Sequence, residues 1–186
     1  LSLFPETAAI TPNGHLAVAG CDVVELAHQF GTPLYLFDEE SLRNQCRSFW
    51  EEFGTRHANL QIIYAAKAFL NKALARILME EGLGLDIVSA GELAIAQAAE
   101  FPMSKLYFHG NNKGRAELEM ALGVGVGRVV LDNFYEISLL EEVASNRGII
   151  QEVLIRVSPG VDPHTHQHTT TGILDSKFGF PIETGQ

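Results

Sequence analysis

The chain between residues 60 and 158 alternates short apolar runs with longer stretches in which apolar residues recur at helical spacing. Short runs rich in Val, Ile and Tyr are typical of buried parallel strands. Successive runs begin 20 to 24 residues apart. A strand followed by a helix at a near-constant period predicts βα units and a parallel sheet. The expected strands are 61–66, 85–89, 105–109, 128–132 and 152–157.

The starts of two expected helices carry capping residues. Ser89-x-x-Glu92 and Asn133-x-x-Glu136 have the spacing of a capping box. We interpret Asp132, directly before Asn133, as a further cap residue. The expected helices are Leu70–Glu81, Gly91–Glu100, Gly114–Leu122 and Phe134–Arg147.

The even period favours a (β/α)8 TIM-type barrel over a doubly wound sheet, whose connections vary more in length. A complete barrel has eight βα units and about 250 residues, whereas this α/β pattern supplies five strands in 186 residues. Five strands alone would leave an open sheet edge and bare apolar faces. We therefore interpret the chain as a partial barrel that belongs to a longer protein.

The first part of the chain lacks this rhythm. Residues 1–33 are expected to be largely irregular, with breaks at Asn13-Gly14 and Gly31-Thr-Pro33. Within them, Cys21 to Phe30 is a helix candidate. Leu34 to Phe37 is a candidate for a short strand. Asp38 or Ser41 is then expected to cap a helix that runs to about Phe53 with one apolar face.

Ionisable residues fall at or near the carboxyl ends of the expected strands, where barrel enzymes place their chemistry. Lys67 stands among alanines where the first strand gives way to a loop. It either reaches into water or, if desolvated, has a lowered pKa and can form a Schiff base. Asp86 lies inside an apolar strand and needs a partner, while His109 and Arg156 have no capping role. The sequence therefore predicts a site on one rim that contains Lys67, Asp86, His109 and Arg156.

Composition narrows the classes of function. The formal net charge of −10 argues against a nucleic-acid partner, which would need a basic patch. No apolar run approaches the roughly 18 residues of a membrane span, and the start of the chain has no signal-peptide features and no initiator Met. Cys21 and Cys46 form neither a disulfide framework nor a zinc motif. These features favour a reduced, cytoplasmic protein without a membrane partner.

Two further motifs resemble ligand-binding sequences, one a dinucleotide-binding loop and the other a metal site, but we do not interpret either as a binding site. Gly123-Val-Gly125-Val-Gly127 precedes a strand and lacks the G-x-G-x-x-G spacing of a dinucleotide loop, so we expect a helix stop and turn. His164-Thr-His166-Gln-His168 is a bare alternation in a Thr-rich segment without candidate supporting residues. We therefore expect no metal site.

Five motifs occur in order along most of the chain. They are Tyr64-Ala-Ala-Lys67-Ala, Gly84-Leu-Asp86-Ile-Val-Ser-Ala-Gly-Glu92-Leu, Phe108-His-Gly-Asn-Asn-Lys113, Leu154-Ile-Arg156-Val and Asp175-Ser-Lys177-Phe-Gly179. Together they resemble the barrel-type (fold type III) pyridoxal-phosphate-dependent decarboxylases. The segment from His164 to Gly179 is similar to the branch of that family that acts on diaminopimelate.

The resemblance implies roles for several residues. Lys67 would hold pyridoxal 5'-phosphate as an imine, Asp86 and Arg156 would lie beside the cofactor, and His109 is carried over as a further cofactor-binding residue. Lys177 matches a lysine that helps to hold the family's homodimer. Residues 1–33 would contribute to a β-rich second domain, and residues 34–186 would form the first part of the cofactor-binding barrel. The family's remaining phosphate-, ring- and substrate-binding residues would lie beyond Gln186.

The implied function is decarboxylation of meso-diaminopimelate to L-lysine, an amino-acid substrate, by the full-length parent, with this chain alone expected to be inactive. Three alternatives remain open. One is a decarboxylase of ornithine, arginine or carboxynorspermidine. Another is a non-catalytic cofactor-binding barrel, although such proteins are single-domain and the extra N-terminal 33 residues count against it. The last is a barrel fragment without a cofactor.

Overall fold

The computed structural model describes residues 3–161 and 178–182. The chain divides into two compact units, residues 1–62 and 63–186. This division differs from the expected domain boundary after residue 33, and the assignment of residues 1–33 to a β-rich second domain stays a prediction. Among the described residues, no helix is long and apolar enough to cross a membrane.

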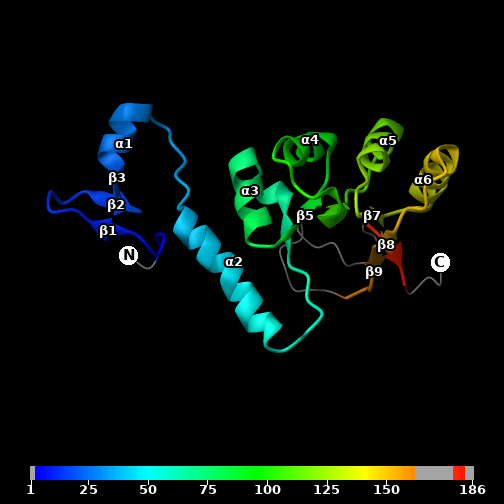
Figure 1. The fold of residues 1–186 in the computed structure, drawn as a ribbon, viewed down its shortest axis with the longest axis horizontal. Helices are drawn as coiled ribbons and strands as arrows, with labels where there is room; N and C mark the ends of the chain where they lie inside the picture. Colours follow the sequence, from blue (N-terminus) through cyan, green and yellow to red (C-terminus); the bar gives the residue numbers. More distant parts are fainter. Residues whose placement is uncertain (1–2, 162–177, 183–186) are drawn as a thin grey trace. The chain divides into compact units, whose positions relative to one another are not determined.

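The first unit contains a small antiparallel sheet and two helices (Figure 1). Its elements are β1 (Ala9–Ile10), β2 (Leu16–Val18), β3 (Cys21–Asp22), α1 (Val23–Phe30) and α2 (Glu39–Gly54). The strands pair in the order β1-β2-β3, so residues 1–33 are more regular than expected. Asp22 caps α1 by accepting hydrogen bonds from the amides of Val24 and Glu25, and His15 Nδ1 lies 2.8 Å from its other oxygen.

Asp38 begins α2 as one of the two expected caps. Its carboxylate accepts hydrogen bonds from the hydroxyls of Ser41 (2.5 Å) and Thr7 (2.7 Å). The Ser41 hydroxyl, followed by that of Thr7, holds the pKa of Asp38 below its usual value, although burial opposes them. The expected strand at Leu34–Phe37 is wrong, since these residues are irregular and exposed. An apolar run predicts a strand only where a neighbouring strand supplies partners for its amides and carbonyls.

The second unit is a five-stranded parallel sheet in the order β4-β5-β6-β7-β8. The strands are β4 (Ile63–Ala65), β5 (Gly84–Ile87), β6 (Leu106–Phe108), β7 (Arg128–Leu131) and β8 (Val153–Ile155). The connecting elements are the 3-10 turns η1 (Ala66–Ala68) and η2 (Met103–Lys105) and the helices α3 (Lys72–Glu80), α4 (Ala90–Ala98), α5 (Arg115–Val124) and α6 (Phe134–Arg147). All five expected strands and four expected helices of this unit are confirmed.

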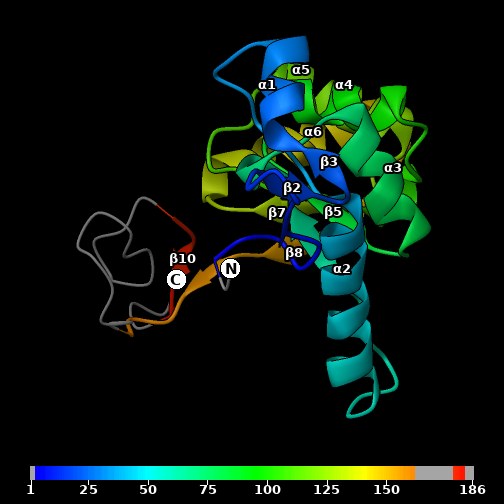
Figure 2. The ribbon, with the colours of Figure 1, turned by 90° about the vertical axis from the view of Figure 1, so that its left-hand side faces the viewer.

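The four helices α3 to α6 follow one another along one face of the sheet (Figures 1 and 2). The core lies between these layers, where Leu85, Ile87, Leu106, Phe108 and Val129 are fully buried. After β8 the chain continues into β9 (Val157–Ser158), which pairs in parallel with β10 (Phe180–Pro181). The side chain of Phe180 is buried against α5 and α6, and its ring meets that of Phe134 edge-on at 4.9 Å.

The glycine-rich motif before β7 ends a helix and makes a tight turn, as expected. Gly125 is the C-cap of α5 with a left-handed backbone (φ +75°). A Cβ atom at Gly127 would lie 2.1 Å from the Ser104 carbonyl oxygen. The backbone approaches there because the turn enters β7 beside the turn that enters β6. The glycines therefore serve chain packing.

Candidate active site at the carboxyl ends of the strands

The four residues predicted from the sequence lie at one edge of the parallel sheet. Lys67 belongs to η1, which directly follows β4, and Asp86 is the third residue of β5. His109 directly follows β6 and donates its amide to Ile87 O at 2.7 Å, while Arg156 directly follows β8 and donates its amide to Leu131 O at 2.9 Å. Parallel neighbours bring these strand ends to the same edge, which is the rim where βα-barrel proteins bind their ligands.

Lys67 is exposed, whereas the preceding Ala66 is buried. The turn that carries Lys67 is braced by the Tyr64 hydroxyl, which donates a hydrogen bond to the Phe69 carbonyl at 2.9 Å. Within the described residues Lys67 therefore lies in contact with water. Its amine is accessible from the rim, which covalent capture of a carbonyl compound requires.

Asp86 has the partner that a carboxylate in an apolar strand needs. His109 Nδ1 lies 3.3 Å from Asp86 Oδ1 and 3.4 Å from Asp86 Oδ2, and both side chains are about a quarter exposed. A single N–H on Nδ1 can satisfy one carboxylate oxygen at a time. Asp86 Oδ1 is accordingly a buried atom without a hydrogen-bond partner among the described residues, and so, on the other side of the imidazole, is His109 Nε2. Buried polar atoms of this kind are rare and mark a place for a further polar group.

Arg156 is held by a second acidic residue. Its guanidinium Nη1 lies 3.2 Å from Oδ2 of Asp132, whose side chain is completely buried. The other carboxylate oxygen of Asp132 accepts a hydrogen bond from the amide of Gly179 at 2.7 Å. The guanidinium also lies 4.3 Å from the centre of the Phe178 ring. The charge of Arg156 is thus fixed on two sides and remains 26% exposed at the rim.

The interpretation of Asp132 as a helix cap is wrong. Asn133 caps α6 by accepting from the Glu136 amide at 2.9 Å, and Asp132 instead pairs with Arg156. Ser89 caps α4 as expected. The acid of each expected capping box accepts a hydrogen bond one residue further back than expected, from the amide of Val88 or Asp132. Each acid therefore ties the end of a strand to the start of the next helix.

Sequence reasoning missed a buried ion pair beside this rim. Lys113 Nζ lies 2.7 Å from Glu136 Oε1, and the two side chains are 1% and 3% exposed. Burial lowers the pKa of the Lys113 ammonium, while the hydrogen bond to Glu136 opposes part of that decrease. The sequence shows Lys113 only as the end of the His109–Lys113 motif and Glu136 only as a capping acid. Lysine and glutamate are common on surfaces, so their identity alone does not indicate a buried pair. The feature that could have indicated it is their separation by about one strand–helix period.

The rim combines groups that suit a small ligand with a carbonyl and an anionic part. It presents an exposed amine, a carboxylate–imidazole pair with unsatisfied buried atoms, and a fixed guanidinium. These groups fit the reactive side of pyridoxal phosphate, because the amine can bond covalently to an aldehyde and the unsatisfied atoms can accept or donate hydrogen bonds. Among the described residues, no glycine-rich loop after a strand of the sheet is available for the phosphate group.

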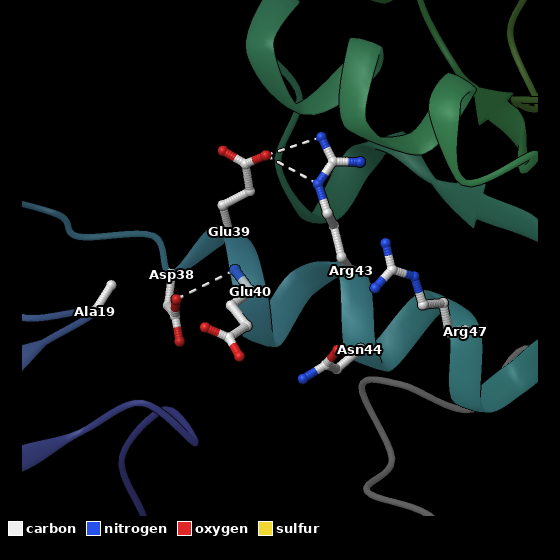
Figure 3. A pocket seen from close by; sticks show the side chains of 7 residues that line it. All are labelled: Ala19, Asp38, Glu39, Glu40, Arg43, Asn44 and Arg47. Carbon is white, nitrogen blue, oxygen red and sulfur yellow. Dashed lines mark hydrogen bonds and ion pairs between the residues drawn. The ribbon is translucent and has the colours of Figure 1, made fainter.

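A hollow of about 370 Å³ in the first unit contains no predicted site residue (Figure 3). It is lined by Ala19, Asp38, Glu39, Glu40, Arg43, Asn44 and Arg47. Several of its polar groups already have partners in the first unit, since Arg43 pairs with Glu39 at 2.8 Å, Asp38 accepts from the Glu40 amide and Asn44 donates to Glu6. The hollow therefore does not compete with the rim as the candidate site. Lys177 and the histidines at 164, 166 and 168 lie outside the described residues.

Comparison with known proteins gives a consistent family. Diaminopimelate decarboxylases from Bacillus methanolicus and Bacillus subtilis (strain 168) are 45% and 47% identical to this chain, covering 98% and 97% of it. The structure of diaminopimelate decarboxylase from M. jannaschii in complex with L-lysine is 35% identical, with a TM-score of 0.85 over 97% of this chain. The chain spans 42%, 41% and 42% of these three proteins, respectively.

The family model described as the pyridoxal binding domain of pyridoxal-dependent decarboxylases matches residues 39–186. That match includes the whole parallel sheet and all four residues of the candidate rim. The chain therefore belongs to the pyridoxal-dependent decarboxylases.

Proposed function

We propose that this chain is part of a pyridoxal-phosphate-dependent carboxy-lyase that converts meso-diaminopimelate to L-lysine. The observation that carries the proposal is the gathering of Lys67, Asp86, His109 and Arg156 at one edge of a sheet that matches the family's pyridoxal binding domain. The substrate is supported by the curated relatives, which are named diaminopimelate decarboxylases, and by the L-lysine complex of the M. jannaschii protein.

Each rim residue has a role that its surroundings support. The exposed amine of Lys67 would hold the cofactor covalently. Asp86 Oδ1 and His109 Nε2, which are buried without partners among the described residues, would bond to polar groups of the cofactor. Arg156 would face an anionic group with a guanidinium already aligned by Asp132. The bound cofactor would supply an electron sink for the negative charge left when the substrate loses carbon dioxide.

The proposed substrate sets a requirement that these four residues do not meet alone. Diaminopimelate carries an amino-acid group at each end, so its far carboxylate and ammonium need partners away from Lys67. A site that pairs such groups rejects analogues lacking them by large factors, because its own polar groups are then left unpaired. We expect those partners in parts of the parent protein outside this chain.

We further propose that the parent is a homodimer of the cytoplasm and more than twice as long as this chain. The chain spans about two fifths of its curated relatives. The edge strand β8 supports the greater length, since its residues Val153, Leu154 and Ile155 are 40%, 44% and 61% exposed. A hollow of about 400 Å³ lies between β8 and α6 and has mainly apolar neighbours such as Leu140 and Ile149. Further barrel elements would cover this surface. Lys177 is the proposed dimer residue.

The experiment uses the full-length parent supplied with pyridoxal phosphate. Release of carbon dioxide is compared for meso-diaminopimelate, ornithine, arginine and lysine, and we expect the first to be turned over fastest. Faster turnover of any of the others would refute the substrate assignment.

Covalent capture by Lys67 is tested separately by a visible absorption band that sodium borohydride abolishes. We expect Lys67→Ala to lack this band. Lys72→Ala, which removes another exposed lysine five positions later at the start of α3, should keep it. A Lys67→Ala protein that retains the band would refute the assignment of this residue.

A further inference from the structure

The buried ammonium of Lys113 lies within contact distance of three oxygen atoms. Besides Glu136 Oε1 at 2.7 Å, it donates to the carbonyl oxygens of Gly110 at 2.6 Å and Val130 at 2.7 Å. An ammonium has three N–H groups. Lys113 therefore joins the residue that follows His109 to strand β7 and to helix α6.

The carboxylate of Glu136 extends this connection toward the rim. Its second oxygen accepts a hydrogen bond from the Asp132 amide at 2.8 Å. The side chain of Asp132 in turn holds Arg156 and the amide of Gly179. A continuous series of polar contacts thus runs from the loop after β6, past the end of β7, to the residue after β8.

Stability alone does not explain a buried pair at this place. Removing two charges from water is costly, and apolar side chains of similar volume often give equal or greater stability. What apolar side chains cannot do is accept from the Asp132 amide and bind the Gly110 and Val130 carbonyls at fixed directions. The pair therefore fixes the spacing between the carboxyl ends of β6 and β7 and the start of α6.

We propose that Lys113 and Glu136 are positioning residues that act through Asp132 to align Arg156 at the rim. This inference rests on the proposed function in that Arg156 is taken as a site residue. Neither Lys113 nor Glu136 touches the ligand in this proposal. Their effect is to orient the Asp132 carboxylate. The quantity to measure is therefore how firmly the groups bonded to this carboxylate are held.

The amide of Gly179 is a suitable reporter, because it bonds to Asp132 and to neither residue of the pair. We propose to measure its hydrogen exchange in the full-length parent without cofactor, for Lys113→Met and Glu136→Gln. We expect exchange at Gly179 to accelerate about tenfold or more, since its acceptor is no longer held. With cofactor and substrate, kcat should fall about tenfold to a hundredfold, as expected for a small misplacement of a site residue.

Val143→Ala is the matched control. Val143 is a buried residue of the same helix, with 2% exposure, and belongs to the apolar core. The comparison is made at equal distance below each variant's melting temperature. Val143→Ala should leave the exchange of Gly179 and kcat near those of the parent. Equal effects of all three variants at Gly179 would overturn the proposal, because the pair would then contribute only general stability.

If either single variant fails to fold, Lys113→Met/Glu136→Leu removes both charges of the pair and carries the test. We expect it to fold and to exchange rapidly at Gly179, and unchanged protection would overturn the proposal. The exchange measurement does not depend on turnover. Rapid exchange in a parent that does not decarboxylate diaminopimelate would support the positioning role while refuting the proposed function.

Discussion

Replacement of Asp132 by Asn tests how firmly Arg156 is held at the rim. The substitution keeps the size of the side chain and removes its charge. In the unsubstituted protein, the Asp132 carboxylate accepts from Arg156 Nη1 at 3.2 Å through one oxygen and from the Gly179 amide at 2.7 Å through the other. An asparagine has one oxygen acceptor, and its NH₂ group would face the remaining donor. One of the two contacts must therefore be lost.

The magnitude follows from the burial of the two partners. A hydrogen bond to a charged group contributes about 1.5 to 3 kcal/mol. Removing one partner of a fully buried ion pair costs about 3 to 5 kcal/mol. Arg156 is 26% exposed and lies over the Phe178 ring, so water and the ring compensate part of the lost charge. We therefore expect Asp132→Asn to lower the free energy of unfolding by about 2 kcal/mol.

The assay is urea unfolding of the full-length parent, followed by circular dichroism, together with kcat for the proposed substrate. A stability change should shift the unfolding midpoint without changing the slope with urea. Asn133→Ser is the control, because serine caps helices about as well as asparagine. We expect its unfolding free energy to change by less than about 0.5 kcal/mol. If Asp132→Asn resembles this control in both stability and kcat, Asp132 does not align Arg156.

Four further substitutions test other parts of the chain. Lys67→Ala in the full-length parent should abolish carbon dioxide release while the circular dichroism spectrum is retained, and residual turnover would contradict its proposed role. Gly127→Ala should destabilise the fold by more than about 2 kcal/mol in urea unfolding, because its Cβ would lie 2.1 Å from a backbone carbonyl oxygen. Gly123→Ala in the same motif should be neutral or slightly stabilising, since its nearest contact is the end of a flexible side chain. The Ser41 hydroxyl is the first cause of the lowered pKa of Asp38. The contribution of Asp38 to the free energy of unfolding is therefore present above the unfolded pKa near 4 and is lost as pH falls through the lower folded value. Asp38→Asn should flatten the loss of stability below about pH 4 in acid titrations monitored by circular dichroism.

The sheet and its helices could be predicted because local signals agreed with one another. The expected helix Phe134–Arg147 has the observed bounds, since an asparagine cap at its start and Gly148 at its end leave no alternative limits. The strand predicted at Leu34–Phe37 failed because composition reports apolar character but not the presence of a neighbouring strand. The rim positions of Asp86 and Arg156 followed from strand direction. Their partners depend on contacts between successive βα units, which no single motif contains.

The separation of these partners is nevertheless regular. Asp86 and His109 are 23 residues apart, and Asp132 and Arg156 are 24 residues apart. Lys113 and Glu136 are also one strand–helix unit apart. Parallel pairing explains the spacing, because each strand lies beside the next one along the chain, as in the pairing of Asp86 with Tyr107.

A polar residue at the end of one strand therefore meets residues about one period later in the sequence. This rule applies to any βα repeat in which consecutive strands are neighbours, and it requires only that the period be read from the apolar runs. In this chain, a search 20 to 24 residues beyond each ionisable residue near a strand end finds His109 from Asp86 and Glu136 from Lys113. The same search also offers Asp132 as a partner of His109, whereas in the structure His109 lies beside Asp86 and Asp132 beside Arg156. For Asp132 the search finds Arg156, 24 residues later. A hydrogen bond between a carboxylate and a guanidinium is stronger than one to a helix amide, and Asn133 already caps the helix, so Arg156 is the favoured partner. The period that predicts the fold thus also narrows the set of charges that can meet at its rim, and the contacts between neighbouring strand ends decide among them.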